Sequence, residues 1–188
     1  VAPGARIWNF RVEDNNGDMM DSYIIACMDA VALNASVPVG GQTIDVANMS
    51  LGGFFPEDRC GVGDPFNDAV CGMVAAGVTT VVAAGNESSD AAFFNPANID
   101  QVITVSALAD SDGAPGRLGG AYSDFCTNSQ ADDSLATFSN YGADVDIAAP
   151  GVGVLSTWPT YLPHSCVPAS GTGYEVLPGT SMASPHVA

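Results

Sequence analysis

Asp64-Pro-Phe-Asn-Asp-Ala-Val-Cys-Gly-Met-Val-Ala-Ala-Gly-Val-Thr-Thr-Val-Val-Ala-Ala84 contains a helix pattern that is followed directly by a strand pattern. Asp64 and Pro65 are typical of an N-cap and a first helical position, and Gly77 is typical of the residue that ends a helix. Between them, apolar residues recur on one side of the predicted helix: Phe66, Ala69, Val70, Met73 and Val74. The run 79–84 is apolar and rich in β-branched residues, which predicts a buried strand.

The same alternation extends along the chain in both directions. A second helix is predicted over 21–35, where Ile24, Met28 and Val31 lie on one face. Further buried strands are predicted at 6–12, 44–51, 102–108 and 145–147. Two irregular stretches, 109–136 and 158–178, are predicted as surface loops. Strands that alternate with helices indicate an α/β fold whose mostly parallel sheet is covered on both faces, with ligands at the carboxyl ends of the strands.

Composition limits the possible partners. The 188 residues are 47% hydrophobic, which suits a single domain over 1–188. No apolar run reaches about 18 residues, so we expect no membrane span. Asp and Glu number 21 against 4 arginines and no lysine, for a net charge of −17, so nucleic acid and anionic membranes are poor partners. We expect salt to stabilise so acidic a surface by screening its self-repulsion.

The five cysteines form no Cys-x-x-Cys pair, and the chain has only two histidines, so a zinc site is not expected. We predict disulfides between Cys60 and Cys71 and between Cys126 and Cys166, each closing a loop rich in Gly or Pro. Cys27 would then be buried on a helix or paired elsewhere. The alternative is that all five are reduced core residues.

One serine stands out in the string Gly179-Thr-Ser-Met-Ala-Ser-Pro-His-Val-Ala188. Small residues surround Ser181, and the sequence after it is compatible with a helix. The free amide groups and positive dipole at a helix N-terminus favour an anion such as the one that develops in acyl transfer. The alternative for a bare Gly-x-Ser is a simple helix cap.

The full ten-residue string, however, resembles the serine motif of the subtilisin family. Further segments resemble family motifs in the family's order: Val1-Ala-Pro-Gly-Ala5, Asn48-Met-Ser-Leu-Gly-Gly53, Val82-Ala-Ala-Gly-Asn86 and Ala149-Pro-Gly151. Within the family, 86–96 and Phe138-Ser-Asn-Tyr-Gly142 look closest to the proteinase K side. The resemblance implies a three-layer subtilisin-like fold, here incomplete at both ends, and a secreted, monomeric serine endopeptidase acting on polypeptides.

This resemblance also implies roles for individual residues. Ser181 would be the nucleophile, and Asn86 would donate a hydrogen bond to the oxyanion beside the Ser181 backbone N–H. One edge of the substrate cleft would be formed by Ser50, Leu51 and Gly52, and the other by Gly17, Asp18 and Met19. Small residues would line the primary specificity pocket, with Glu87 at its rim: Ala83, Ala84 and Gly85.

A general base is missing from this assignment. His186 corresponds to a structural histidine of the family and would point away from Ser181, while His164 lies in a proline-flanked loop. We therefore expect the catalytic aspartate and histidine to precede Val1, and the last helices to follow Ala188. A peptide-binding pseudoprotease and an unrelated α/β binding domain are the alternatives.

The resemblance to the proteinase K side also implies a structural calcium ion, and no organic cofactor. The Asp146 carboxylate, together with the backbone carbonyls of Asp100 and Val102, would supply the oxygen ligands that this hard cation prefers. Asp144 lies nearby. The alternative is that Asp144 and Asp146 are simply solvated carboxylates at the end of a strand.

Overall fold

The computed structural model describes residues 3–36, 41–56, 58–61, 63–122, 126, 128–161 and 173–188. The helices are α1 (Asp21–Ser36), α2 (Pro65–Ala75) and α3 (Thr180–Val187), with a 3₁₀ turn, η1, at Ala91–Phe93. The strands are β1 (Val46–Met49), β2 (Gly53–Phe54), β3 (Thr79–Ala83), β4 (Phe94–Asn95), β5 (Ile103–Ala109), β6 (Ser134–Leu135), β7 (Ile147–Pro150), β8 (Val154–Thr157) and β9 (Tyr174–Leu177).

A five-stranded sheet forms the centre of the structure. Its parallel part runs β1-β3-β5, β7 pairs in parallel with β5, and β6 pairs antiparallel with the end of β5. The parallel pairs β1-β3, β3-β5 and β5-β7, with α2 between β1 and β3, confirm the predicted mostly parallel α/β sheet. Two further sheets are antiparallel pairs, β2 with β4 and β8 with β9.

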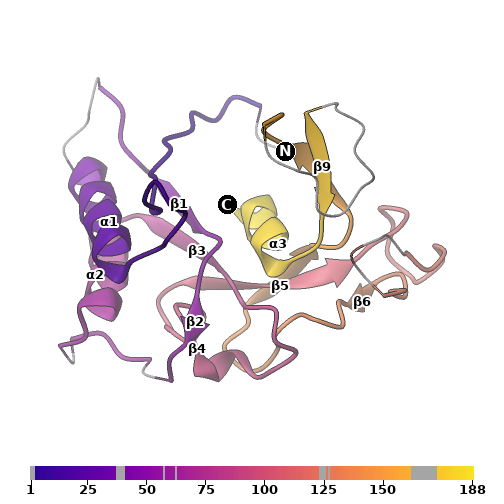
Figure 1. The fold of residues 1–188 in the computed structure, drawn as a ribbon. Helices are drawn as coiled ribbons and strands as arrows, with labels where there is room; N and C mark the ends of the chain where they lie inside the picture. Colours follow the sequence, from indigo (N-terminus) through magenta and orange to yellow (C-terminus); the bar gives the residue numbers. More distant parts are fainter. Residues whose placement is uncertain are drawn as a thin grey trace.

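Helices cover both faces of the central sheet. Consecutive residues of a strand point to opposite faces, and in β3 Val82 packs into the cluster that contains Ile24 and Val70 of the first two helices. Its neighbour Val81 packs instead into the cluster that contains Ala183 of α3. Accordingly, α1 and α2 lie together on one side of β1 and β3 and α3 lies on the other (Figure 1). The predicted three-layer arrangement is confirmed.

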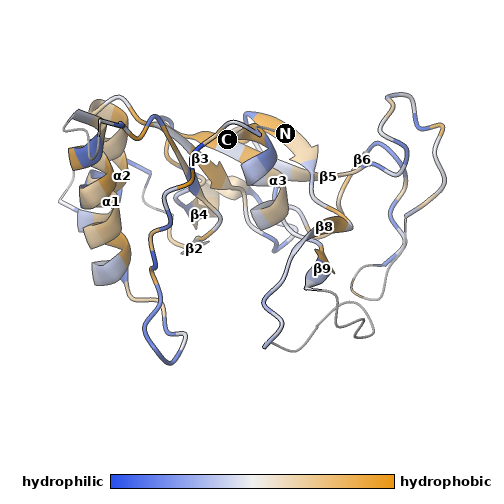
Figure 2. Cartoon of the chain, turned by 90° about the horizontal axis from the view of Figure 1, so that it is seen from above, coloured by the Kyte–Doolittle hydropathy of each residue, from blue (hydrophilic) through white to orange (hydrophobic). Residues whose placement is uncertain are grey.

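The stretch 64–84 folds as its pattern predicts. The Asp64 side chain accepts hydrogen bonds from the backbone N–H groups of Phe66 and Asn67, and Pro65 occupies the first helical position. Gly77, with a φ of 93°, follows the end of α2 in the left-handed conformation that glycine adopts without steric cost. The strand β3 begins two residues later, and its valines are buried. Figure 2 shows β3 and β5 as hydrophobic strands at the centre of the molecule.

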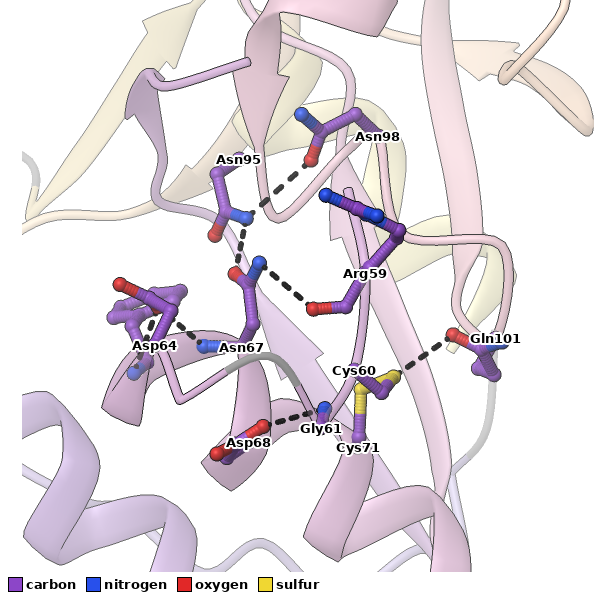
Figure 3. The surroundings of a disulfide bond; sticks show 11 residues. Arg59, Cys60, Gly61, Asp64, Asn67, Asp68, Cys71, Asn95, Asn98 and Gln101 are labelled. Carbon is purple, nitrogen blue, oxygen red and sulfur yellow. Dashed lines mark hydrogen bonds between the residues drawn. A yellow bond between two sulfur atoms is a disulfide. The ribbon is translucent and has the colours of Figure 1, made fainter. Parts of the chain in front are cut away.

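One predicted disulfide, Cys60–Cys71, is confirmed, and it ties the loop before α2 to that helix, with 6.0 Å between the two Cα atoms (Figure 3). Cys126 is also disulfide-bonded, and its predicted partner Cys166 lies outside the described residues. Cys27 is a free thiol on α1 and is half-buried rather than fully buried. The alternative of five reduced cysteines is therefore wrong.

Four predictions of local structure are corrected. The segment 6–12 is not a strand: no described strand pairs with it, and Ile7 is 91% exposed. The strand predicted at 145–147 begins only at Ile147, because the N–H of Val145 closes a turn onto Gly142. The two stretches predicted as loops are not wholly loops: β6 lies within 109–136 and pairs with β5, and β9 lies within 158–178 and pairs with β8. A strand exists only where another strand satisfies its backbone, and local composition does not supply that partner.

A cavity of about 940 Å³ lies beside β1, the edge strand of the described sheet. Its walls include residues 4–10 and the inward sides of Ile24, Met28 and Val31 of α1. In the part of the chain that the structure describes, no helix has the length and apolar character needed to cross a membrane.

Candidate active site

Asn86 and Thr180 meet at the carboxyl end of β3, although 94 residues separate them. The Thr180 backbone N–H and the Thr180 hydroxyl both donate to Asn86 Oδ1, at 2.9 and 3.1 Å. A backbone N–H can only donate, so the atom facing Thr180 must be the carbonyl oxygen of the amide. The amide nitrogen of Asn86 is therefore at the other end, and no described residue accepts a hydrogen bond from it.

Ser181 lies in the first turn of α3, whose N-cap is Gly179. The first backbone N–H groups of a helix have no acceptor inside the helix, so this turn presents donors to an incoming group. The Ser181 hydroxyl is 3.4 Å from the Ser50 carbonyl oxygen. Ser50 is itself fixed beneath the helix, because its hydroxyl donates to the Ser181 carbonyl at 2.8 Å and lies 3.0 Å from the Ser184 hydroxyl.

A pocket of about 230 Å³ opens between these segments. Most of the residues predicted for the cleft line it: Met19, Ser50, Leu51, Gly52, Ala83, Ala84, Gly85, Asn86, Glu87 and Ser181. Gly17 and Asp18 do not line it; they belong to the turn before Met19, in which the Asp18 backbone N–H donates to Asp14 Oδ1. The pocket is thus bounded by the end of β1, the end of β3 and the start of α3.

Internal packing requires a glycine at position 52. A Cβ at this position would be 2.8 Å from the Asn95 carbonyl oxygen, which is too close for any side chain. The close approach joins the end of β1 to β4, and Phe94 and Asn95 of that strand complete one wall of the pocket. Gly52 thus has an internal packing role besides its predicted place at the edge of the cleft.

The two histidines provide no general base within the described structure. Nδ1 of His186 lies 2.8 Å from the Met182 carbonyl, so the ring is bonded to its own helix. His164 lies outside the described residues. The only partner that the Ser181 hydroxyl has among the described residues is the Ser50 carbonyl.

Carboxylates gather near the start of β7. Asp146 Oδ2 accepts a hydrogen bond from the Thr104 backbone N–H at 2.8 Å. The pKa of Asp144 is raised, first by partial burial and then by repulsion from Asp90 and Asp100. Carboxylate oxygens are ligands of the kind that suits a hard divalent cation. The described residues at this predicted site therefore fit calcium in chemistry.

A second acidic group, which the sequence analysis did not single out, lies in the long loop 109–136. Carboxylate oxygens of Asp110, Asp132 and Asp133 lie within 4.8 Å of one another. All three carboxylates accept hydrogen bonds from backbone N–H groups of the same segment. The donors are Ser111 and Gly119 for Asp132, Gly116 for Asp133, and Gly113 for Asp110. Their hydrogen bonds to backbone N–H groups account for this cluster as a structural feature of the loop.

Two residues that shape the pocket were missed from sequence. Thr180 orients Asn86, and the buried Asn140 contacts the loop 84–89 that follows β3. Both lie inside strings that had been noted for other reasons, Gly179–Ala188 and Phe138–Gly142. The sequence signal that could have indicated these two residues is their polarity. The structure shows that the fold buries both polar side chains completely.

Comparison with known proteins identifies the family of the chain. The profile described as Subtilase family matches residues 1–188, the whole chain. The chain belongs to the subtilase family. Among curated subtilases and their relatives, the extracellular serine proteinase of Thermus sp. (strain Rt41A) is 36% identical over 187 residues. The cuticle-degrading protease of Metarhizium anisopliae is 35% identical over 188 residues.

Solved subtilase structures show the same fold. A cold-adapted subtilisin-like serine proteinase superposes with a TM-score of 0.63 at 34% identity, over 94% of this chain and 48% of that one. A protease of Pseudoalteromonas arctica superposes with a TM-score of 0.59 at 33% identity, over 90% of this chain and 44% of that one. The match covers all of this subtilase chain but only 35% of the Thermus protein and 38% of the Metarhizium protein.

Proposed function

We propose that the protein to which this chain belongs is a serine endopeptidase that cleaves polypeptides through an acyl-enzyme on Ser181. The observation that carries the proposal is the juxtaposition of Ser181, at the N-terminus of α3, with an Asn86 side chain whose carbonyl is held by Thr180. A nucleophile and a preorganised donor at one pocket are two of the groups that acyl transfer requires.

The oxyanion would be stabilised by two donors. As Ser181 Oγ attacks the scissile carbonyl carbon, the carbonyl oxygen gains negative charge. Asn86 Nδ2 and the backbone N–H of Ser181 in the first turn of α3 are the donors proposed to meet it. Because Thr180 holds Asn86 Oδ1, the amide does not need to reorient during the reaction, and this preorganisation is what makes such donors effective.

An extended substrate would lie along Ser50, Leu51 and Gly52, which follow β1 directly, with Met19 on the opposite side. Main-chain pairing with this segment would be a form of strand addition. The primary specificity pocket would be walled by Ala83, Ala84 and Gly85, whose small side chains leave room for a large substrate residue. Glu87 lines the same pocket and would favour a basic side chain.

The proton of Ser181 needs an acceptor that the described residues do not supply. We propose that a histidine, oriented by an aspartate, comes from chain outside these 188 residues. In support, the chain spans about a third of the length of the curated relatives it matches. The cavity beside β1 borders Ser50, which contacts Ser181, and it leaves room there for further chain.

We propose a structural calcium ion held by the Asp146 carboxylate and the carbonyls of Asp100 and Val102, with no organic cofactor. The pKa of Asp144 is raised by partial burial and then by the negative charges of Asp90 and Asp100, and this local excess of negative charge supports a cation there. If the ion binds, the melting temperature of the full-length protein rises when calcium replaces chelator, and Asp146→Asn removes that rise. An identical melting temperature in calcium and in chelator would contradict the site.

The parent protein is further proposed to be a secreted monomer that binds neither nucleic acid nor membranes. Its disulfides favour an oxidising compartment, and relatives are named extracellular and cuticle-degrading proteases. The net charge of −17 opposes binding to polyanions.

A fluorophosphonate probe tests the proposed activity, because it phosphonylates an activated serine hydroxyl and releases fluoride. We expect the full-length protein to be labelled, the Ser181→Ala variant to resist, and the control Ser156→Ala, an exposed serine on β8, to be labelled normally. A folded full-length protein that resists the probe would instead be a peptide-binding pseudoprotease.

A further inference from the structure

Asn140 is a fully buried side chain placed directly behind the loop 84–89, which follows β3 and carries Asn86. Its Oδ1 accepts hydrogen bonds from the backbone N–H groups of Glu87, at 2.9 Å, and Ser89, at 3.0 Å. Its Nδ2 donates to the Ala84 carbonyl at 2.9 Å and to Glu87 Oε2 at 2.8 Å. An amide has two donor hydrogens and two acceptor lone pairs, so the loop uses all of the side chain's hydrogen-bonding capacity.

These contacts bracket Asn86 on both sides. The backbone N–H of Asn140 donates to the Gly85 carbonyl at 2.9 Å, so the residues before and after Asn86 are both attached to Asn140. Gly85 has a φ of 104°, and a Cβ there would clash with Asn140 Nδ2 and lie 2.6 Å from Glu87 Oε2. The absence of a side chain at Gly85 is therefore what lets the Asn140 amide approach the loop.

Asn140 is itself held by the sheet. Its carbonyl accepts from the Ser106 hydroxyl of β5 at 2.7 Å and from the Ser139 hydroxyl at 3.0 Å, and Ser139 also accepts from the Ala107 N–H. Ser106 and Ser139 are both buried. A rigid strand thus fixes Asn140, and Asn140 in turn fixes the loop 84–89.

From this geometry we infer that Asn140 is a positioning residue for catalysis: it sets the place of Asn86 and the direction of the Glu87 carboxylate at the pocket. This inference rests on the proposed function. Asn140 holds the backbone of the loop while Thr180 holds the Asn86 amide, so the oxyanion donor is fixed through two independent contacts. Misplacing a catalytic group by about 1 Å lowers the rate about 100-fold, so a polar clamp behind the loop acts on the rate rather than on substrate affinity.

The test uses the full-length protein with Asn140→Asp, which keeps the shape of the side chain but loses both donors. We expect kcat to fall about 10- to 100-fold with KM within about threefold, and the affinity for a peptide aldehyde, whose adduct with serine carries the oxyanion, to fall in parallel. Glu87→Gln alone is the reference for the double variant, because Glu87 lines the pocket and its own replacement changes substrate binding, while the Asn140 amide can still donate to the Gln oxygen. The double variant N140D/E87Q should recover part of the lost rate, because the Gln amide can donate to the new carboxylate.

Asn98→Asp is the matched control. Asn98 is likewise a buried amide, and it donates to the backbone carbonyls of Phe55 and Ala92. It does not line the pocket, and its Oδ1 accepts from the Asn95 amide (Figure 3), an acceptor that Asp keeps. The Asn98→Asp variant should have a lower melting temperature than the wild type and should retain its kcat. If Asn140→Asp does not fold, Asn140→Ser, which adds no charge, replaces it. A kcat equal to that of the wild type in the folded Asn140 variant overturns the inference.

Hydrogen exchange of the segment 84–89 separates this inference from the proposed function. Exchange should be at least about tenfold faster in Asn140→Ser than in the wild type or in Asn98→Asp, because the Glu87 and Ser89 amides lose their acceptor. If the wild type is folded but neither cleaves peptides nor reacts with the probe, the proposed function fails. Faster exchange then still supports the role of Asn140 in holding the loop, and unchanged exchange overturns it.

Discussion

Thr180 fixes Asn86 with two donors at once: its backbone N–H at 2.9 Å and its hydroxyl at 3.1 Å both meet the same carbonyl oxygen. The Thr180 hydroxyl also accepts from the Gly85 N–H at 3.2 Å, so a single buried side chain joins the first turn of α3 to the loop after β3. The nucleophile and the proposed oxyanion donor are therefore parts of one hydrogen-bonded unit.

Replacing Thr180 by valine, which keeps its volume, removes the hydroxyl from this unit. We expect kcat to fall about tenfold with little change in KM, because the orientation of Asn86 matters most when the oxyanion forms. Thr180→Ser keeps the hydroxyl and should retain most of the rate. Steady-state kinetics on one peptide substrate compare the variants, and a kcat retained in Thr180→Val would overturn the role of the hydroxyl.

Removing the amide of Asn86 tests the donor directly. Asn86→Ala should lower kcat about 10²- to 10³-fold, the magnitude established on subtilisin itself for loss of an oxyanion-hole donor. Labelling of Ser181 by the fluorophosphonate probe should persist, although more slowly, because the nucleophile is intact. An unchanged kcat would rule out Asn86 as the donor.

The long loop 109–136 depends on the ionised form of Asp132. Hydrogen bonds from the Ser111 N–H, first of all, and from the Gly119 N–H lower the pKa of Asp132 below its usual range. A lowered pKa in the folded state means that the carboxylate stabilises the fold above the pKa of an unfolded aspartate, and that this contribution is lost as the pH falls through the folded-state pKa.

Asp132→Asn should therefore lower the melting temperature at neutral pH, and the difference from the wild type should shrink in acid. Thermal unfolding of both proteins between about pH 2 and 7 measures it, using the reference pKa of about 3.9 for an unfolded aspartate. A difference in melting temperature that is independent of pH would mean that the charge of Asp132 contributes nothing.

The Cys60–Cys71 disulfide closes a loop over a sequence separation of 11 residues. Chain-entropy estimates for loops of this size give a contribution of about 3 kcal/mol to the free energy of unfolding. The Cys60→Ser/Cys71→Ser double variant should lose about that amount in denaturant titrations, whereas Cys27→Ser, which removes the free thiol of α1, should change stability far less. If only Cys27→Ser lowered the free energy of unfolding, the stabilisation assigned to the Cys60–Cys71 disulfide would be wrong.

Much of the local structure could be predicted from the sequence. Asp64, Pro65 and Gly77 mark both ends of α2, and the β-branched run after them forms β3, because caps and side-chain periodicity act over a few residues. The segment 6–12 has the same apolar character, yet it is not a strand. A strand depends on a neighbour to satisfy its backbone, and composition carries no information about that neighbour.

By itself, then, the sequence determined the α/β class, the bounds of the main helices and strands to within a few residues, one disulfide and the motif around Ser181. Only the tertiary structure decided which distant residues hold the loop after β3. Thr180 contacts Asn86, which is 94 residues away, and Asn140 contacts Glu87, which is 53 residues away. The physical reason is that buried polar groups must find hydrogen-bond partners, and the fold, not the local pattern, brings those partners within reach.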